Sequence, residues 1–128
     1  MAKILFADDE PDIVYLVKKL LERNGHETIV TYSGNDVLTL AKKERPDLVL
    51  LDIMMPGPNG WEVSKALKSD EETRDIPVVM LTVRTSKDSI EKSLTYAKAT
   101  AHIGKPATTE EILHTIDAVL SPSKGAAA

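Results

Sequence analysis

Five side chains with complementary chemistry stand where short apolar runs of the sequence end. Asp8 and Asp9 follow the first run, Asp52 the third and Thr82 the fourth, and Lys105 comes shortly after the fifth. Carboxylates brought together repel one another, by about 1 kcal/mol for a pair ~4 Å apart in water and by more at a partly buried edge. Such a cluster needs a cation, and oxygen ligands without sulfur or imidazole favour Mg²⁺. The sequence therefore predicts a Mg²⁺ site, which Mn²⁺ could also occupy.

Asp52 is the candidate nucleophile of this set. Four apolar residues precede it, so its backbone is expected to be rigid. A rigid carboxylate beside a divalent ion can attack phosphorus and form an acyl phosphate. The metal and Lys105 would offset charge on the transferred group, and the Thr82 hydroxyl would bond one of its oxygens. Each residue alone has a plainer explanation, as a helix cap, a turn or a loop. Their positions at the ends of successive runs favour a common site.

The surrounding sequence alternates apolar runs with amphipathic segments. Continuous apolar runs are typical of strands buried on both faces of a parallel sheet, and apolar residues three or four apart indicate helices. The expected strands are residues 4–7, 28–30, 48–51, 78–81 and 101–103, and the expected helices are residues 11–24, 35–44, 61–68, 87–97 and 110–120. Five strand–helix repeats predict an α/β fold with helices on both faces of a parallel sheet. The carboxyl ends of its strands would bring the five side chains to one edge.

Composition and charge exclude several classes of protein. The 128 residues suit one domain, predicted as residues 1–121, followed by a disordered tail or linker stump at residues 122–128. A net charge of −4 argues against direct binding of nucleic acid, and the absence of cysteine excludes disulfides and thiolate metal sites. No apolar run resembles a signal peptide or is long enough to cross a bilayer. A cytoplasmic protein without membrane attachment is therefore expected.

At the residues that carry this chemistry, the sequence closely resembles the CheY-like response-regulator receiver domain of two-component signalling. The matching residues are Asp8-Asp9, Asp52 within Leu-Leu-Asp-Ile-Met-Met-Pro-Gly-Pro-Asn-Gly, Thr82 within Met-Leu-Thr-Val, and Lys105-Pro106. The resemblance extends from about residue 3 to residue 120. It implies a flavodoxin-like (βα)5 fold, a three-layer sandwich whose five-stranded parallel sheet has the order 2-1-3-4-5, with a cis bond before Pro106.

The resemblance also implies a function. Asp52 would accept a phosphoryl group from a phosphohistidine on a sensor histidine kinase or phosphotransfer protein, or from a small phosphodonor, and Thr82 and Lys105 would contact that group. The protein would be no enzyme beyond this self-phosphorylation and autodephosphorylation. Movement of Thr82 would alter the face built from the fourth helix, fifth strand and fifth helix, and so signal to an unidentified protein target. The Mg²⁺ ligands that the resemblance implies are Asp8, Asp9, Asp52 and the backbone carbonyl of Met54.

Five positions depart from the family pattern. His102 stands where the family has a switching aromatic residue, so it is either a core or edge histidine with no switching role or a switch side chain that rotates. Val83 replaces a smaller residue and could narrow access to the phosphoryl group. Lys98 replaces a common glycine in the segment just before the fifth strand. Met54 and Arg84 flank the path of the hydrolytic water, and because an apolar Met54 cannot orient water, slow dephosphorylation is predicted.

The first expected helix and three aromatic side chains give further expectations. Val14 and Tyr15 fall off the apolar stripe of this helix and are either scattered surface residues or a kinase-docking patch. His26 and His114 are predicted at the surface, and Trp61 is predicted in the core. The stripe that we expect to be buried consists of Ile13, Leu16, Val17, Leu20 and Leu21.

Three other functions are compatible with the expected architecture. A flavin or nucleotide binder would need a loop rich in glycine or hydroxyls after the first strand, where this chain has Asp8-Asp9-Glu10-Pro11. A hydrolase with an aspartate nucleophile would need a second acid two positions later, where Met54 stands. A binding module that is never phosphorylated stays open. No sequence pattern identifies the kinase, the output, the oligomeric state, or whether the chain stands alone.

Overall fold

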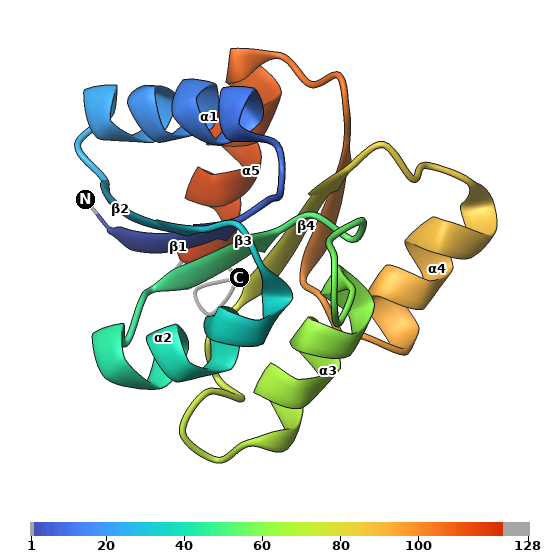
Figure 1. Ribbon diagram of the computed structural model, residues 1–128. Coiled ribbons are helices and arrows are strands. Elements are labelled where there is room, and N and C mark those ends of the chain that lie inside the picture. The colour runs from blue at the N-terminus through green and yellow to red at the C-terminus, as the bar shows by residue number, and fades with distance from the viewer. Residues whose placement is uncertain (1, 122–128) are drawn as a thin grey trace.

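One five-stranded parallel sheet forms the centre of the protein (Figure 1). The structure is a computed structural model that describes residues 2–121. The neighbouring strands are all parallel and lie in the order β2-β1-β3-β4-β5, which confirms the predicted flavodoxin-like order. The strands are β1 (Lys3–Ala7), β2 (Glu27–Thr31), β3 (Leu48–Leu51), β4 (Val78–Thr82) and β5 (Ala101–Gly104). Each strand agrees with its predicted range to within one residue at either end.

Helices lie on both faces of the sheet and complete a three-layer sandwich (Figure 1). Side chains of β1 and β3 alternate between two buried clusters, with Phe6 and Leu50 on the α1 and α5 side and Leu5 and Leu51 on the α2 and α3 side. The helices are α1 (Pro11–Arg23), α2 (Val37–Glu44), α3 (Gly60–Ser69), α4 (Lys87–Thr95) and α5 (Thr109–Leu120), with a short 3₁₀ turn (Gly34–Asp36) before α2. Within residues 2–121, no helix has the length and apolar character needed to cross a membrane. The predicted tail at residues 122–128 lies outside the described residues.

Side-chain caps explain where the helices after β3 begin. Asn59 and Glu62 form a capping box at the start of α3, and Thr108 and Glu111 form another at the start of α5. The Ser86 hydroxyl accepts an amide hydrogen from the first turn of α4. These caps hold the loops that leave the carboxyl edge of the sheet.

The predicted buried stripe of α1 is wrong at two positions. Leu16 is 61% exposed, whereas Val14, which was placed off the stripe, is only 2% exposed. The buried positions are Val14, Val17 and Leu21, which follow one another at helical spacing. The apolar residues of α1 span a wider arc than the sheet covers, so one side of that arc remains open. Tyr15 is exposed, as expected.

Four other positions test the sequence analysis. His26 is buried rather than at the surface, because it precedes β2 and lies against the chain start, where its Nδ1 accepts the Ala2 amide hydrogen at 3.1 Å. Lys98 has a φ of 57°, the left-handed conformation that glycine adopts readily, and β5 still forms after it. The predictions of a buried Trp61 and an exposed His114 are confirmed.

We predict that Gly60→Ala destabilises the protein. A Cβ at this position would lie 2.5 Å from the Asp52 carbonyl oxygen and 2.7 Å from the Ile53 Cα, and neither backbone atom can rotate away. The free energy of unfolding, measured by urea denaturation, should fall by about 1–3 kcal/mol. Gly104→Ala is the control, since its close contact at 2.6 Å is the Thr85 Cγ2 of a side chain that can turn. Equal losses in the two variants would contradict the backbone explanation.

Candidate functional site

The carboxyl ends of the strands meet at one edge of the sheet, as predicted. Backbone hydrogen bonds join the segments that leave this edge. The Asp52 amide donates to the Ala7 carbonyl at 3.0 Å, and the Lys105 amide donates to the Thr82 carbonyl at 2.7 Å. The ends of β1, β3, β4 and β5 are therefore held in register, and the residues just beyond them form one site.

The Lys105 ammonium group lies at the centre of this site. Its Nζ lies 2.6 Å from Asp8 Oδ2, 3.4 Å from Asp52 Oδ2 and 3.5 Å from Glu10 Oε1. Asp8 is fully buried and Asp52 is 4% exposed, whereas the Glu10 side chain is largely exposed. The structure thus brings together the predicted residues Asp8, Asp52 and Lys105.

Each buried carboxylate is held at both of its oxygens. Asp8 Oδ1 accepts the Glu10 amide hydrogen at 3.0 Å, and Asp52 Oδ1 accepts the Met54 amide hydrogen at 3.1 Å. The other oxygen of each group faces Lys105. This repeated arrangement, with an amide two residues later on one side and an ammonium on the other, fixes both side chains in orientation.

Burial and hydrogen bonding have opposite effects on the pKa values of Asp8 and Lys105. Burial raises the pKa of Asp8, and the hydrogen bonds from Lys105 and the Glu10 amide offset that rise only in part. Burial alone would lower the pKa of Lys105, but its hydrogen bond to Asp8 and the charges of Asp52 and Asp8 together raise it. Lys105 therefore stays charged, and the carboxylates around it remain incompletely compensated.

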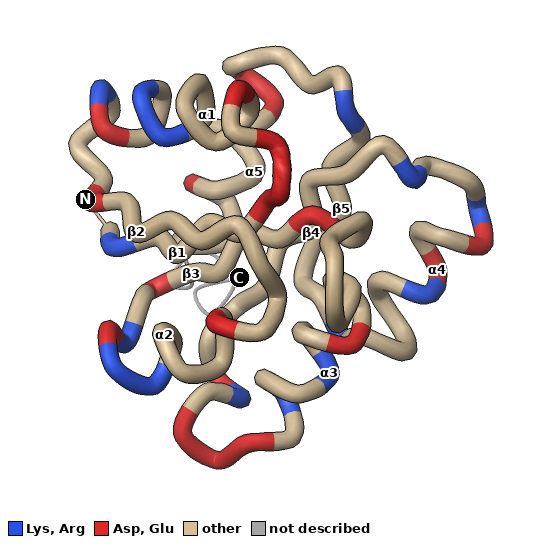
Figure 2. Tube along the Cα trace, in the orientation of Figure 1, with Lys and Arg blue, Asp and Glu red and all other residues tan. Residues whose placement is uncertain are grey.

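Three carboxylates of this site could hold a metal ion. Oxygens of Asp8, Glu10 and Asp52 lie within 4.8 Å of one another, and Figure 2 shows the acidic stretch where β1 leads into α1. Their three formal negative charges against the one positive charge of Lys105 leave two, which suits a divalent cation, and all the ligands are hard oxygens. Asp9 is exposed and lies outside this group, so its role as a ligand stays a prediction. Glu10 was not predicted, although its place directly after the aspartate pair was a signal.

Thr82, Pro106 and Met54 are the other predicted positions near the carboxylates and Lys105. Thr82 is fully buried, and its Oγ1 accepts the Arg84 amide hydrogen at 3.3 Å. Within residues 2–121, no hydrogen bond joins the Thr82 hydroxyl to Asp52 or Lys105. The predicted cis bond between Lys105 and Pro106 is present. The Met54 side chain is half exposed beside Asp52, and its carbonyl as a metal ligand stays a prediction.

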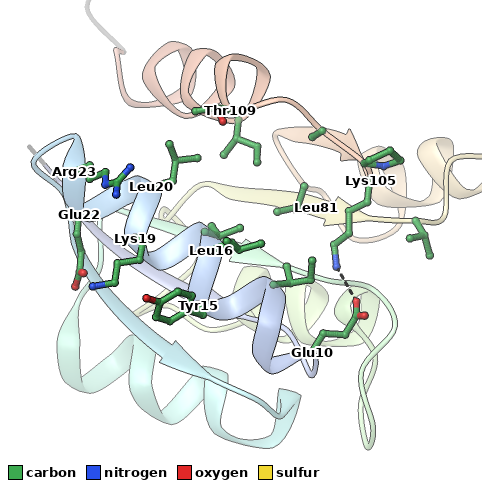
Figure 3. Close-up of a pocket in the computed structure, with 16 residues that line it drawn as sticks. Glu10, Tyr15, Leu16, Lys19, Leu20, Glu22, Arg23, Leu81, Lys105 and Thr109 are labelled. Atoms are coloured by element: carbon green, nitrogen blue, oxygen red, sulfur yellow. Dashed lines mark hydrogen bonds and ion pairs between the residues drawn. The ribbon is translucent and has the colours of Figure 1, made fainter.

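An apolar groove of about 1140 Å³ runs from this site between α1 and α5 (Figure 3). Glu10 and Lys105 stand at one end of the groove, where a dashed line joins them. Tyr15, Leu16 and Leu20 line its wall on α1. The open side of the α1 apolar arc therefore faces a groove that begins at the charged cluster.

The sequence matches a known protein family and several known proteins over most of its length. The family model of the response regulator receiver domain matches residues 4–117. Protein PilH of Pseudomonas aeruginosa is 40% identical over 124 residues, which cover 94% of this chain and 99% of that protein. The polar-differentiation response regulator DivK of Brucella ovis is 38% identical over 117 residues, which cover 91% of this chain and 94% of that protein.

Solved structures agree with the relatives. The chemotaxis protein CheY4 of Vibrio cholerae is 32% identical, with a TM-score of 0.87 over 93% of this chain and 98% of that one. The beryllofluoride-activated N-terminal receiver domain of RstA from Klebsiella pneumoniae is 30% identical, with a TM-score of 0.86 over 92% of this chain and 97% of that one. Since the family match, the relatives and the sheet order agree, the chain belongs to the response regulator receiver domain family of two-component signalling.

Proposed function

We propose that this receiver domain accepts a phosphoryl group on Asp52 from a phosphohistidine of a sensor histidine kinase or phosphotransfer protein. Mg²⁺ would be bound at the acidic cluster, by which we mean Asp8, Glu10 and Asp52. One observation carries the proposal. Asp52 is an almost fully buried carboxylate, oriented by the Met54 amide at one oxygen and 3.4 Å from the Lys105 ammonium at the other. A carboxylate that is buried, oriented and placed beside two further acids is suited to react in the presence of a divalent cation.

The residues of the site have distinct parts in this reaction. An Asp52 oxygen would form a bond to phosphorus while the bond from phosphorus to the donor nitrogen breaks and its electron pair stays on the imidazole. Lys105 would offset charge on the phosphoryl oxygens, and the Thr82 hydroxyl would donate to one of them. Mg²⁺, when bound, would supply further compensation of that charge. Its ligands would be Asp8 and Asp52, with Asp9 and the Met54 carbonyl as the further predicted ones.

The groove between α1 and α5 is the proposed docking surface for the phosphohistidine-bearing partner. It is lined by apolar side chains of α1, and it ends at Glu10 and Lys105, so a partner lying in it would reach the acceptor. Tyr15 and Leu16 are each 61% exposed, which makes them the main apolar contacts offered on α1. The docking patch hypothesised at Val14 and Tyr15 therefore moves to Tyr15 and Leu16, because Val14 is buried.

The phosphorylated domain would be long-lived and would act on another protein. The phosphorylated form should lose its phosphate slowly, because Met54 is apolar and the Arg84 side chain is engaged with Ser89 and with the Trp61 ring. Beyond this self-phosphorylation and autodephosphorylation the protein would have no enzymatic activity. It would act in the cytoplasm and signal through the face of α4, β5 and α5 to a protein target.

We predict that acetyl phosphate with Mg²⁺ adds one phosphoryl group to the wild type and none to Asp52→Asn, as measured by intact mass. Asp47→Asn is the matched control, because Asp47 is exposed just before β3, at the opposite end of the same strand. It should be modified like the wild type. Loss of the added mass with time measures the slow dephosphorylation. Modification of Asp52→Asn to the wild-type extent would place the acceptor elsewhere.

Mg²⁺ should stabilise the wild type and should do so through the acidic cluster. A cation that binds only the folded state at 100 times its Kd stabilises by about 2.7 kcal/mol, which raises Tm. Asp8→Asn should abolish the Mg²⁺-dependent rise in Tm, and Asp9→Asn should weaken it. Asp117→Asn on α5 should leave it unchanged, since Asp117 is exposed and outside the cluster. A full response in Asp8→Asn would contradict this metal site.

Leu16→Asp should slow phosphotransfer from a phosphohistidine protein while leaving modification by acetyl phosphate unchanged. The reason is that a charge in the apolar groove opposes docking of a protein donor but not access of a small one. Leu94→Asp is the control, because Leu94 is an exposed apolar residue on α4 that does not line this groove. Equal slowing with both donors, or no slowing with either, would count against the docking surface.

A further inference from the structure

A continuous series of hydrogen bonds connects Thr82 to helix α3. The Arg84 amide donates to Thr82 Oγ1 at 3.3 Å, and the Arg84 carbonyl lies 2.8 Å from His102 Nε2. His102 Nδ1 lies 2.8 Å from Ser93 Oγ, which accepts the Trp61 Nε1 hydrogen at 2.9 Å. The series, which we call the Ser93 relay, thus links the end of β4, the strand β5, the helix α4 and the start of α3.

The chemistry of the groups sets the direction of the relay. A carbonyl oxygen carries no hydrogen, so His102 Nε2 must donate to Arg84. In the neutral ring Nδ1 is then an acceptor, and the Ser93 hydroxyl donates to it while accepting the hydrogen of Trp61. Every donor in the series has one acceptor. Because each bond depends on the position of the next, displacement of one member disturbs the others.

The relay is an important attachment of α4. The buried residues of this helix are Ser89 and Ser93, both polar, whereas α1 and α5 bury valine, leucine and isoleucine. Ser93 is fully buried and bonds both His102 and Trp61. The position of α4 is therefore determined by specific hydrogen bonds more than by apolar packing.

Arg84 takes part in the relay through its backbone and also reaches Trp61 with its side chain. Its backbone carbonyl bonds His102, and its guanidinium group lies 5.1 Å from the centre of the Trp61 ring. The Lys92 ammonium lies 4.5 Å from the same ring. Any shift of the segment between Thr82 and Arg84 therefore changes both the hydrogen bonding and the electrostatic surroundings of Trp61.

We propose that Ser93 is a positioning residue that couples the phosphoryl group on Asp52 to Trp61, so that α3 as well as the face of α4, β5 and α5 responds to phosphorylation. The inference rests on the proposed function. A phosphoryl group that binds the Thr82 hydroxyl would move the segment that carries Arg84, and this movement would break the hydrogen bond between the Arg84 carbonyl and His102. Because Ser93 bonds both His102 and Trp61, the hydrogen bond to the indole would change as well. Because coupling is reciprocal, the relay also biases the acceptor toward its unphosphorylated arrangement.

Trp61 is the only tryptophan of the chain, so its indole resonance is a direct probe. We expect beryllofluoride with Mg²⁺ to shift the ¹⁵N–¹H indole signal of the wild type, and Ser93→Ala to remove that shift while the variant still accepts a phosphoryl group. Ser93→Ala should also bind beryllofluoride about fivefold more tightly or better, because a contact specific to the unphosphorylated arrangement is lost.

Ser64→Ala is the matched control. Ser64 is also a fully buried serine at the boundary of α3 and α4, but it donates to the Ala97 carbonyl and is no part of the relay. It should keep the wild-type indole shift and beryllofluoride affinity even if its Tm falls as much as that of Ser93→Ala.

The possible results separate the relay from the proposed function. A wild type that gains a phosphoryl mass without any indole shift would overturn the relay and leave the acceptor role of Asp52 standing. Loss of the shift in Ser64→Ala as well as in Ser93→Ala would make the effect one of general packing, and so would also overturn it. A wild type that gains no phosphoryl mass would refute the proposed function and remove the input of the relay with it.

Discussion

The burial of two carboxylates at one edge of a sheet is the constraint on which the rest of this structure depends. Asp8 and Asp52 are almost inaccessible to water, and they face the same ammonium group. Like charges in such surroundings separate unless a rigid frame and a counter-charge hold them together. Parallel strands supply the frame, because their carboxyl ends coincide, and Lys105 after the last strand supplies the counter-charge. The cost of this arrangement is what a divalent cation would relieve.

The helices are attached to the sheet in two different ways. Helices α1 and α5 bury apolar side chains in a continuous cluster, whereas the buried residues of α4 are serines. Moving an apolar helix exposes hydrocarbon to water, whereas moving α4 mainly requires that the hydrogen bonds of its buried serines be exchanged. The groove that begins at the charged cluster therefore lies between two helices held by apolar packing. Helix α4, whose buried side chains are polar, follows the segment that carries Thr82 and Arg84.

Two of the five departures from the family pattern, His102 and Arg84, are in contact with each other. His102 stands at the position of the family's switching aromatic residue, and both polar atoms of its ring are used, one by Ser93 and one by Arg84. The Arg84 side chain, in turn, contacts Ser89 and lies over the Trp61 ring. These two substitutions, which are 18 residues apart along the chain, thus belong to one local network. Their consequences should be considered together, since removal of one partner leaves another buried polar group without its own.

The strands were predictable because each is a run of apolar residues buried on both faces. The ends of the helices were predictable because caps such as Thr108 act locally. The order of the strands came from the family resemblance, since periodicity contains no information about which strands are neighbours. Leu16 and Val14 were exchanged because amphipathicity defines an apolar arc but not how much of it the sheet covers. Glu10 and the burial of His26 were missed because both depend on what a distant segment places beside them.

By itself the sequence determined which residues end the strands, and therefore that Asp8, Asp52, Thr82 and Lys105 would share one edge. The physical reason is that strand and helix periodicity are properties of neighbouring residues, and the parallel arrangement follows from their alternation. Only the tertiary structure decided that Lys105 faces Asp8 more closely than Asp52, that Leu16 opens into a groove, and that Ser93 joins His102 to Trp61. These contacts arise between elements, where side-chain directions and distances depend on packing that no local pattern contains.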